Sequence, residues 1–125
     1  MSRLVVALSM LLAAGSARAE WVKYSDFPSG TSYYDATTVR KNGDVARVWV
    51  FSDLHERMDG QWSRRALTEF DCGKSQYRTL RQTSFSGPMM SGEIDSKYTF
   101  TDPNEWRDVV SASPNATLLN IVCKR

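Results

Sequence analysis

The chain has 125 residues and a net charge of +2, from 16 basic and 14 acidic residues. Arg3 and Arg18 are the only charged residues among the first 19, so residues 20–125 carry equal numbers of basic and acidic side chains. A balanced charge gives no bulk attraction to nucleic acid or to an anionic membrane, and the length leaves room for one small domain rather than a two-domain enzyme.

The first 19 residues have the pattern of a secretory signal peptide. Arg3 gives the leader a positive start, residues 4–14 are mostly apolar, and Ala17-Arg18-Ala19 places small residues before a cleavage site between Ala19 and Glu20. The apolar stretch is too short to cross a bilayer. Position 20 holds no cysteine that could carry a lipid. We therefore expect a leader over 1–19 and an exported domain over 20–125 with no stable membrane anchor.

Short strands and turns are expected over most of this domain. Asn42-Gly43 is a strong hairpin signal, because both positions of such a turn need positive φ. The polar stretch 53–61 predicts a loop, and Ser86-Gly87-Pro88 predicts a break. The strands are expected over residues 21–24, 32–35, 37–41, 45–51, 62–72, 76–85 and 92–100.

The end of the chain predicts a helix of about ten residues. Ser113 followed by Pro114 is typical of a helix start, since the hydroxyl caps the first turn and proline fits its first position. The apolar side chains expected on one face are those of Ala116, Leu119, Val122 and Cys123. So short a helix is unstable alone and needs a surface to pack on.

Two cysteines, Cys72 and Cys123, lie in the domain and predict one disulfide in an oxidising compartment. A metal site is less favoured, because neither has another cysteine or a histidine at ligand spacing. The bridge brings the helix to the strand end that holds Cys72. The predicted fold class is α+β, mainly β: an antiparallel meander of about six strands with one C-terminal helix packed on a face and tethered by the disulfide.

Two segments resemble catalytic motifs but lack necessary residues. Gly73-Lys74-Ser75 is similar to the end of a phosphate-binding loop, yet Thr68 stands where that loop needs glycine. His55-Glu56 begins like a zinc-protease helix, but Asp59 replaces the second histidine. We predict no catalytic residues, no metal site and no cofactor.

The acidic residues Asp53, Glu56 and Asp59 could in principle hold calcium. They lack the alternating ligand pattern and the closing glutamate of a known calcium loop. A solvated loop is the favoured interpretation.

One predicted strand combines arginine and aromatic side chains. Arg47, Trp49 and Phe51 alternate onto the same face, and protein-binding surfaces favour both kinds of side chain. The alternative is that the aromatic residues fill a thin core while arginine covers its rim. We predict a partner-binding surface at these three residues.

A set of short motifs spread from Trp21 to Cys123 resembles the surface-adhesin protein E family. The motifs are Trp21-Val22, Tyr33-Tyr34-Asp35, Val48-Trp49-Val50, Glu69-Phe70-Asp71-Cys72, Ser86-Gly87-Pro88, Trp106 and Val122-Cys123. The resemblance implies a six-stranded antiparallel sheet with a disulfide-tethered helix. The family's founding member is a surface adhesin that binds host extracellular-matrix and serum proteins, with haem proposed as a ligand. Its lipidated cysteine is replaced here by Glu20.

The resemblance implies an exported bacterial envelope protein that acts as a non-catalytic binding module in the periplasm, at the cell surface or secreted. Its expected partners are host matrix or serum proteins. One alternative is a periplasmic small-ligand or haem binder that uses the concavity between helix and sheet, with His55 or Met89-Met90 as axial ligands. Another is a structural subunit of an envelope assembly.

Overall fold

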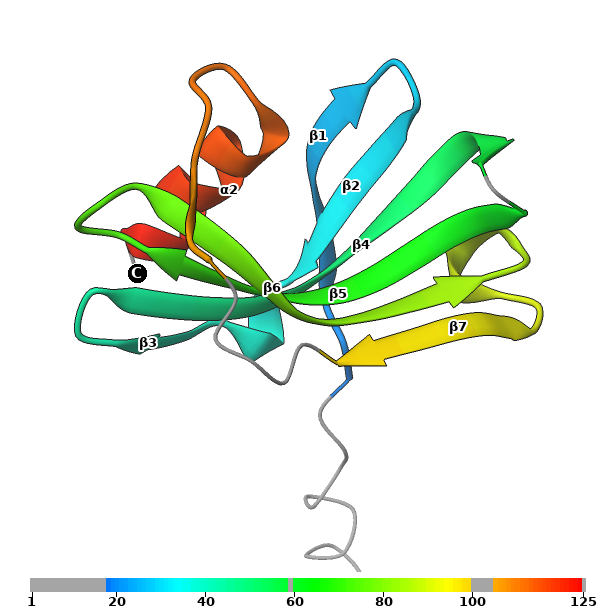
Figure 1. Ribbon diagram of the computed structural model, residues 1–125, viewed down its shortest axis with the longest axis horizontal. Helices are drawn as coiled ribbons and strands as arrows, with labels where there is room; N and C mark the ends of the chain where they lie inside the picture. Colours follow the sequence, from blue (N-terminus) through cyan, green and yellow to red (C-terminus); the bar gives the residue numbers. More distant parts are fainter. Residues whose placement is uncertain (1–17, 59, 100–104, 125) are drawn as a thin grey trace, which may run out of the picture.

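The computed structural model describes residues 18–58, 60–99 and 105–124, in which six strands form an antiparallel meander (Figure 1). Their order in the sheet is β1-β2-β4-β5-β6-β7. The strands are β1 (Trp21–Phe27), β2 (Gly30–Asp35), β4 (Val45–Met58), β5 (Gln61–Asp71), β6 (Gln76–Phe85) and β7 (Ile94–Thr99). The predicted fold class is confirmed.

Two short strands and two 3-10 turns complete the sheet. Strand β3 (Arg40–Asn42) pairs with β4 beyond the end of β2, and β8 (Arg107–Asp108) pairs with β6 beyond β7. The turn η1 (Ala36–Thr38) joins β2 to β3, and η2 (Pro88–Met90) follows β6. A hairpin joins β3 to β4 as predicted, but Asn42 pairs with Val45, so the turn residues are Gly43 and Asp44 rather than Asn42 and Gly43. Of the two positive φ values expected there, only that of Gly43, +63°, is found.

The prediction of a loop over residues 53–61 is wrong, because β4 and β5 continue through most of it. Asp53 pairs with Ser63 across the two strands, and Leu54 is buried. The backbone N–H of His55 bonds to the loop between β1 and β2. Backbone pairing and one buried apolar side chain therefore extend the hairpin although most of its side chains are polar.

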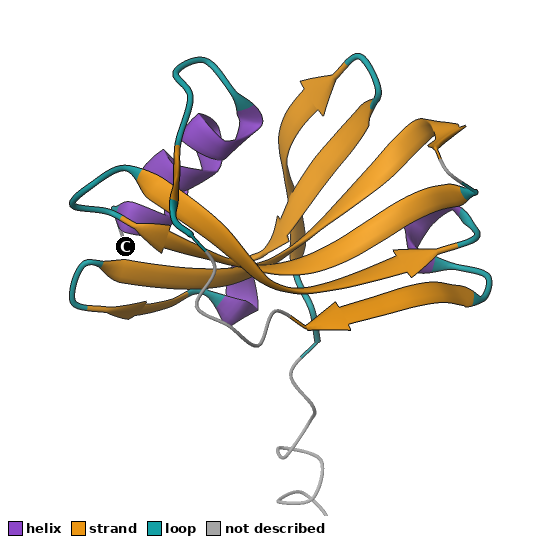
Figure 2. Cartoon of the chain, viewed as in Figure 1, coloured by secondary structure: helices purple, strands orange, loops and turns teal. Residues whose placement is uncertain are grey.

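The helix α2 (Pro114–Cys123) packs on one face of the sheet. Ser113 caps it as predicted, its Oγ accepting a hydrogen bond of 3.2 Å from the backbone N–H of Ala116. In Figure 2 the β1–β2 hairpin rises beside α2 on the same side of the sheet. A cavity is lined by residues of the sheet, of this hairpin and of the first turn of α2, and we call this hollow the trough.

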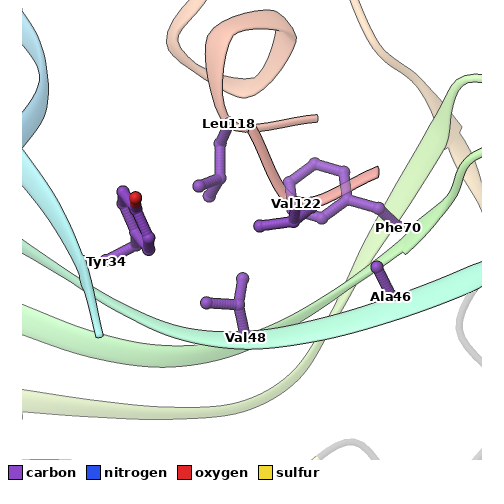
Figure 3. Packing of buried hydrophobic residues seen from close by; sticks show 6 residues of the cluster. All are labelled: Tyr34, Ala46, Val48, Phe70, Leu118 and Val122. Atoms are coloured by element: carbon purple, nitrogen blue, oxygen red, sulfur yellow. The ribbon is translucent and has the colours of Figure 1, made fainter. Parts of the chain in front are cut away.

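The main hydrophobic core lies beneath α2. Leu118 and Val122 point from the helix toward the sheet (Figure 3), where Val48 and other apolar side chains meet them. The buried members of this cluster are Tyr34, Ala46, Val48, Phe70, Leu118 and Val122. Val122 is fully buried as predicted, and the predicted Leu119 and Cys123 pack against the cluster while only partly buried. Leu118, which was not predicted, is the fully buried leucine of the helix.

A disulfide joins Cys72 and Cys123, whose Cα atoms are 5.7 Å apart. It attaches the last turn of α2 to the end of β5, as predicted from the sequence. Lys41 of β3 donates a 2.8 Å hydrogen bond to the backbone carbonyl of Cys123. The last turn of α2 is therefore attached to β3 as well as to β5. Within the residues that the structure describes, no helix has the length and apolar character needed to cross a membrane.

We expect the paired substitution Cys72→Ala and Cys123→Ala to lower the free energy of unfolding by about 4 kcal/mol, because the bond closes a long loop in the unfolded chain. Guanidinium unfolding of the oxidised wild type and the variant measures the loss. Reduced wild type serves as the control and should match the variant. Equal stability of all three samples would contradict the structural role of the bond.

Candidate functional site

The side chains of β4 and β5 alternate between the two faces of the sheet. Ala46 and Val48 point toward α2 and are buried, whereas Arg47 and Trp49 lie on the opposite face. We call this opposite surface the arginine face. Its arginine residues are Arg40, Arg47, Arg65, Arg78 and Arg81.

Of the three residues predicted to bind a partner, Phe51 is only 1% exposed. The ring of Trp21 meets it edge-on at 4.8 Å, and the ring of Tyr33 stacks on it at 4.6 Å. Phe51 therefore forms a second hydrophobic cluster under the arginine face. Arg47 is exposed and Trp49 is half-buried, so the three residues share a face of the sheet but differ in their exposure to solvent.

Trp49 supports an arginine side chain from the neighbouring strand. The guanidinium carbon of Arg65 lies 5.0 Å from the centre of the Trp49 ring. Such stacking combines a cation–π attraction with restricted motion of a long side chain. The exposed guanidinium group is therefore held at a defined place on the surface.

A buried glutamate organises the other end of the arginine face. Glu69 is 4% exposed, and its two carboxylate oxygens accept hydrogen bonds from Arg47 at 2.8 Å and from Arg78 at 2.8 Å. Burial by itself raises the pKa of Glu69, but the bonds and charges of the two arginines outweigh it and the pKa is lowered. Arg78 also stacks on Trp106, with 4.2 Å between the guanidinium carbon and the ring centre.

The arginine face carries more positive charge than its ion pairs neutralise. The pairs found among the described residues are Lys23–Asp26, Arg47–Glu69 and Arg78–Glu69. Arg40, Arg65 and Arg81 therefore have no ion-pair partner in the described part of the chain. The arginine face can attract an acidic surface.

The trough on the other side of the sheet contains a cavity of about 370 Å³. It lies between the β1–β2 hairpin and the first turn of α2, and Arg64 is the only one of its lining residues with a charged side chain. Hydroxyl, amide and aromatic groups supply most of the rest. The lining residues are Tyr24, Phe27, Ser32, Val50, Ser52, Arg64, Ala66, Thr68, Tyr77, Thr79, Gln82, Ser113, Pro114 and Asn115.

Hydroxyl groups interact at the wall of this cavity formed by β1, β2 and β4. The Oγ atoms of Ser32 and Ser52 are 3.0 Å apart. Burial raises the pKa of Tyr24, and its hydrogen bond with Ser32 acts in the opposite direction. These side chains therefore form a connected set of hydrogen-bonding groups that a polar ligand can join.

The predicted haem ligands lie outside the cavity. His55 is exposed, with Nε2 at 3.5 Å from Thr31 Oγ1, and the backbone N–H of Met89 donates to Asp53 at 2.8 Å. Neither these residues nor Met90 line the cavity. The structure therefore does not bring the predicted axial ligands to the concavity.

Of the acidic residues weighed for calcium, Asp53 and Glu56 lie in β4 rather than in a loop. Asp53 is bonded to η2, Glu56 is exposed, and Asp59 lies outside the described residues. Across the part of the chain that the structure describes, no three histidine, cysteine, aspartate or glutamate residues are grouped as metal ligands.

Two features were not predicted from the sequence. Arg64 and Arg65 lie on opposite faces of the sheet, and Glu69 accepts hydrogen bonds from two arginines. The first follows from strand alternation, because consecutive residues of β5 must point to opposite faces. The position of Glu69 has a weaker signal, since it is the one acidic residue in the predicted strand segment that begins at Leu67 and continues to Phe70. Its partners on β4 and β6 depend on strand register. The stacking of Trp106 on Arg78 has no local sequence signal.

Comparison with known proteins gives one family and a set of related structures. A family model described as surface-adhesin protein E matches residues 21–124. Crystal form II of Haemophilus influenzae protein E is similar, with a TM-score of 0.63 and 9% identity over 87% of this chain and 91% of that chain. Protein E from non-typeable Haemophilus influenzae gives 0.60 and 9% over 87% and 78%. At 9% identity, these TM-scores show that the fold is shared and nothing more. No curated protein matches the chain.

We expect Glu69→Gln to lower the free energy of unfolding at pH 7 by about 1–3 kcal/mol, because two arginines lose the charged acceptor of their hydrogen bonds. In the wild type the lowered pKa of Glu69 stabilises the fold above the pKa of the unfolded chain. This contribution disappears as the pH falls through the lower folded value. Urea unfolding between pH 7 and pH 3 should therefore show a smaller acid loss in the variant.

The exposed carboxylate of Glu56 provides the control for this measurement. Glu56→Gln should keep the pH dependence of the wild type. Parallel acid losses in wild type and Glu69→Gln would show that the buried carboxylate does not stabilise the fold in this way.

Proposed function

The chain belongs to the surface-adhesin protein E family, and we propose that it is a non-catalytic binding module of the bacterial envelope that attaches to host matrix or serum proteins through its arginine face. The arrangement that supports this role is a set of three arginines on one side of the sheet, Arg40, Arg65 and Arg81, which form no ion pair with any described residue. The partner surface that fits them is acidic.

Arg65 on Trp49 is the proposed centre of this surface. Arginine and tryptophan are enriched among the residues that dominate protein–protein binding energy. Trp49 holds the guanidinium group at 5.0 Å, and Phe51 beneath the face is packed between two other rings. A side chain that is already held in place loses less entropy on binding than a free one.

Export fits this role. We propose that the leader over residues 1–19 is removed between Ala19 and Glu20, and that residues 20–125 form the mature domain. The Cys72–Cys123 bond suits an oxidising compartment outside the cytoplasm. The exported domain then stays in the periplasm, reaches the cell surface or is secreted.

Arg65→Gln is expected to weaken binding to immobilised vitronectin, laminin or plasminogen about tenfold, because it removes a central positive charge and its stacking on Trp49. Surface plasmon resonance at low and high salt measures the affinity, which should also fall with salt. Arg64→Gln is the matched control, since the adjacent residue of the same strand lines the opposite trough. Equal affinities of wild type and Arg65→Gln would contradict the proposal.

A second function, binding of a small organic anion, is favoured by the cavity in the trough. Its volume of about 370 Å³ is at the small end of the range of roughly 300–1,000 Å³ that ligand sites occupy. The lining offers one guanidinium group, many hydroxyl groups and no carboxylate. The N-terminal turn of α2 faces the same space, and its dipole favours negative charge. An acidic sugar has the matching chemistry.

Glucuronate and glucose test this second function, because they differ in one carboxylate group. We expect glucuronate to bind saturably and glucose to bind at least about tenfold more weakly, as a charged hydrogen bond to Arg64 is lost. Amide NMR titration should show shifts along the trough. Arg64→Gln should abolish the preference for glucuronate, and Arg65→Gln should retain it. Absence of saturable glucuronate binding would contradict this second function. It would not affect the proposal that the arginine face binds a protein.

A further inference from the structure

Asp35 is a buried carboxylate at the end of β2. It is 5% exposed, and its Oδ1 accepts hydrogen bonds from the backbone N–H and the Oγ1 of Thr37 at 3.0 and 2.7 Å. The backbone N–H of Glu20 donates a third bond to the same oxygen at 3.0 Å. Within the described residues, all the bonds made by this carboxylate fall on Oδ1, which leaves Oδ2 open to another donor.

The charge of Asp35 has no cationic partner in the described part of the chain. None of the ion pairs formed there includes it. Burial raises the pKa of Asp35, but the hydrogen bonds from Glu20 and Thr37 outweigh this effect and the pKa is lowered. The group is therefore ionised at neutral pH. Among the described residues only Ser84 Oγ is a buried side-chain atom without a hydrogen-bond partner, so the unbonded Oδ2 of Asp35 reaches solvent. A cation that bonds to Oδ2 would stabilise the charged carboxylate further.

Glu20 is itself exposed, but it is the first described residue whose backbone N–H and carbonyl both have hydrogen-bond partners. Its N–H bonds to Asp35, and its carbonyl accepts a 2.8 Å hydrogen bond from the backbone of Ala36. Arg18 and Ala19, just before it, are exposed. The bond between Ala19 and Glu20 thus lies at the boundary between accessible chain and fixed chain, where proteolysis is favoured.

We propose that hydrolysis of the Ala19–Glu20 bond supplies the missing counter-ion, because the new α-ammonium group of Glu20 forms an ion pair with Asp35. Water is the only co-reactant, and a signal peptidase is the catalyst. The C–N bond breaks, Ala19 keeps the new carboxylate, and the amine of Glu20 becomes protonated at neutral pH. One neutral donor is thereby replaced by a charged group with three donors, one of which can serve Oδ2.

Because of this ion pair, removal of the leader stabilises the folded domain. The precursor holds a buried charge with hydrogen bonds alone, whereas the mature domain also neutralises it. The mature N-terminus is then fixed against the junction of β2 and η1, close to Trp21, which covers Phe51 under the arginine face. Cleavage one or two residues earlier would leave Asp35 without its cation.

Expression of the full-length gene with export tests the proposal. Intact mass analysis of the disulfide-bonded product should place the N-terminus at Glu20. A second gene carries Gly-Ser inserted after Ala19, so that the same cleavage leaves a two-residue extension and restores an uncharged amide at Glu20. We expect the extension to raise the equilibrium constant for unfolding about tenfold, measured by urea unfolding at pH 7.

Asp35→Asn combined with the extension completes a double-mutant cycle. The extension should have no further effect once the carboxylate is gone. Asp26→Asn is the matched control, because it removes an exposed carboxylate of β1 and should leave the effect of the extension unchanged. Equal effects of the extension in wild type and Asp35→Asn overturn the proposal, as does an N-terminus other than Glu20. If the protein with the Gly-Ser extension is as stable as the protein without it, the proposal is overturned by that result alone.

Discussion

The attachment of α2 to the sheet is the constraint on which the rest of the structure depends. A single sheet buries little apolar surface unless something covers one of its faces. Here Leu118 and Val122 fill that role, and the Cys72–Cys123 bond holds their helix in place. Because the helix is short, it covers only one end of the face. The uncovered remainder is the trough, and its position follows from where the disulfide anchors the helix.

The two candidate binding surfaces follow from the alternation of one strand. Arg64 and Arg65 are neighbours in sequence, yet one lines the trough while the other stacks on Trp49. A thin domain can therefore present different chemistry on its two sides without additional elements. The arginine face offers spaced positive charges suited to a protein surface. The trough offers one positive charge among hydroxyl groups and suits a small molecule.

Two buried acids hold strands and side chains in place outside the main hydrophobic core. Glu69 holds Arg47 and Arg78 together across three strands, and Asp35 ties the start of the domain to the end of β2. Both carboxylates are lowered in pKa because hydrogen bonds outweigh their burial. Such groups give little net stability when compared with apolar packing, but they fix strand ends and side chains in a single arrangement. Binding surfaces benefit from that fixed geometry.

The sequence by itself determined the meander, the hairpin at Gly43, the helix start at Ser113 and the pairing of its two cysteines. These features depend on local backbone preference or on the count of available partners. Only the tertiary structure decided that residues 53–58 continue a strand, that Phe51 is buried, and that Glu69 and Asp35 are bound as they are. Those outcomes depend on strand register and on which distant side chains cover a position. Neither is encoded within a few residues of the chain, because both arise only when segments far apart in sequence come together.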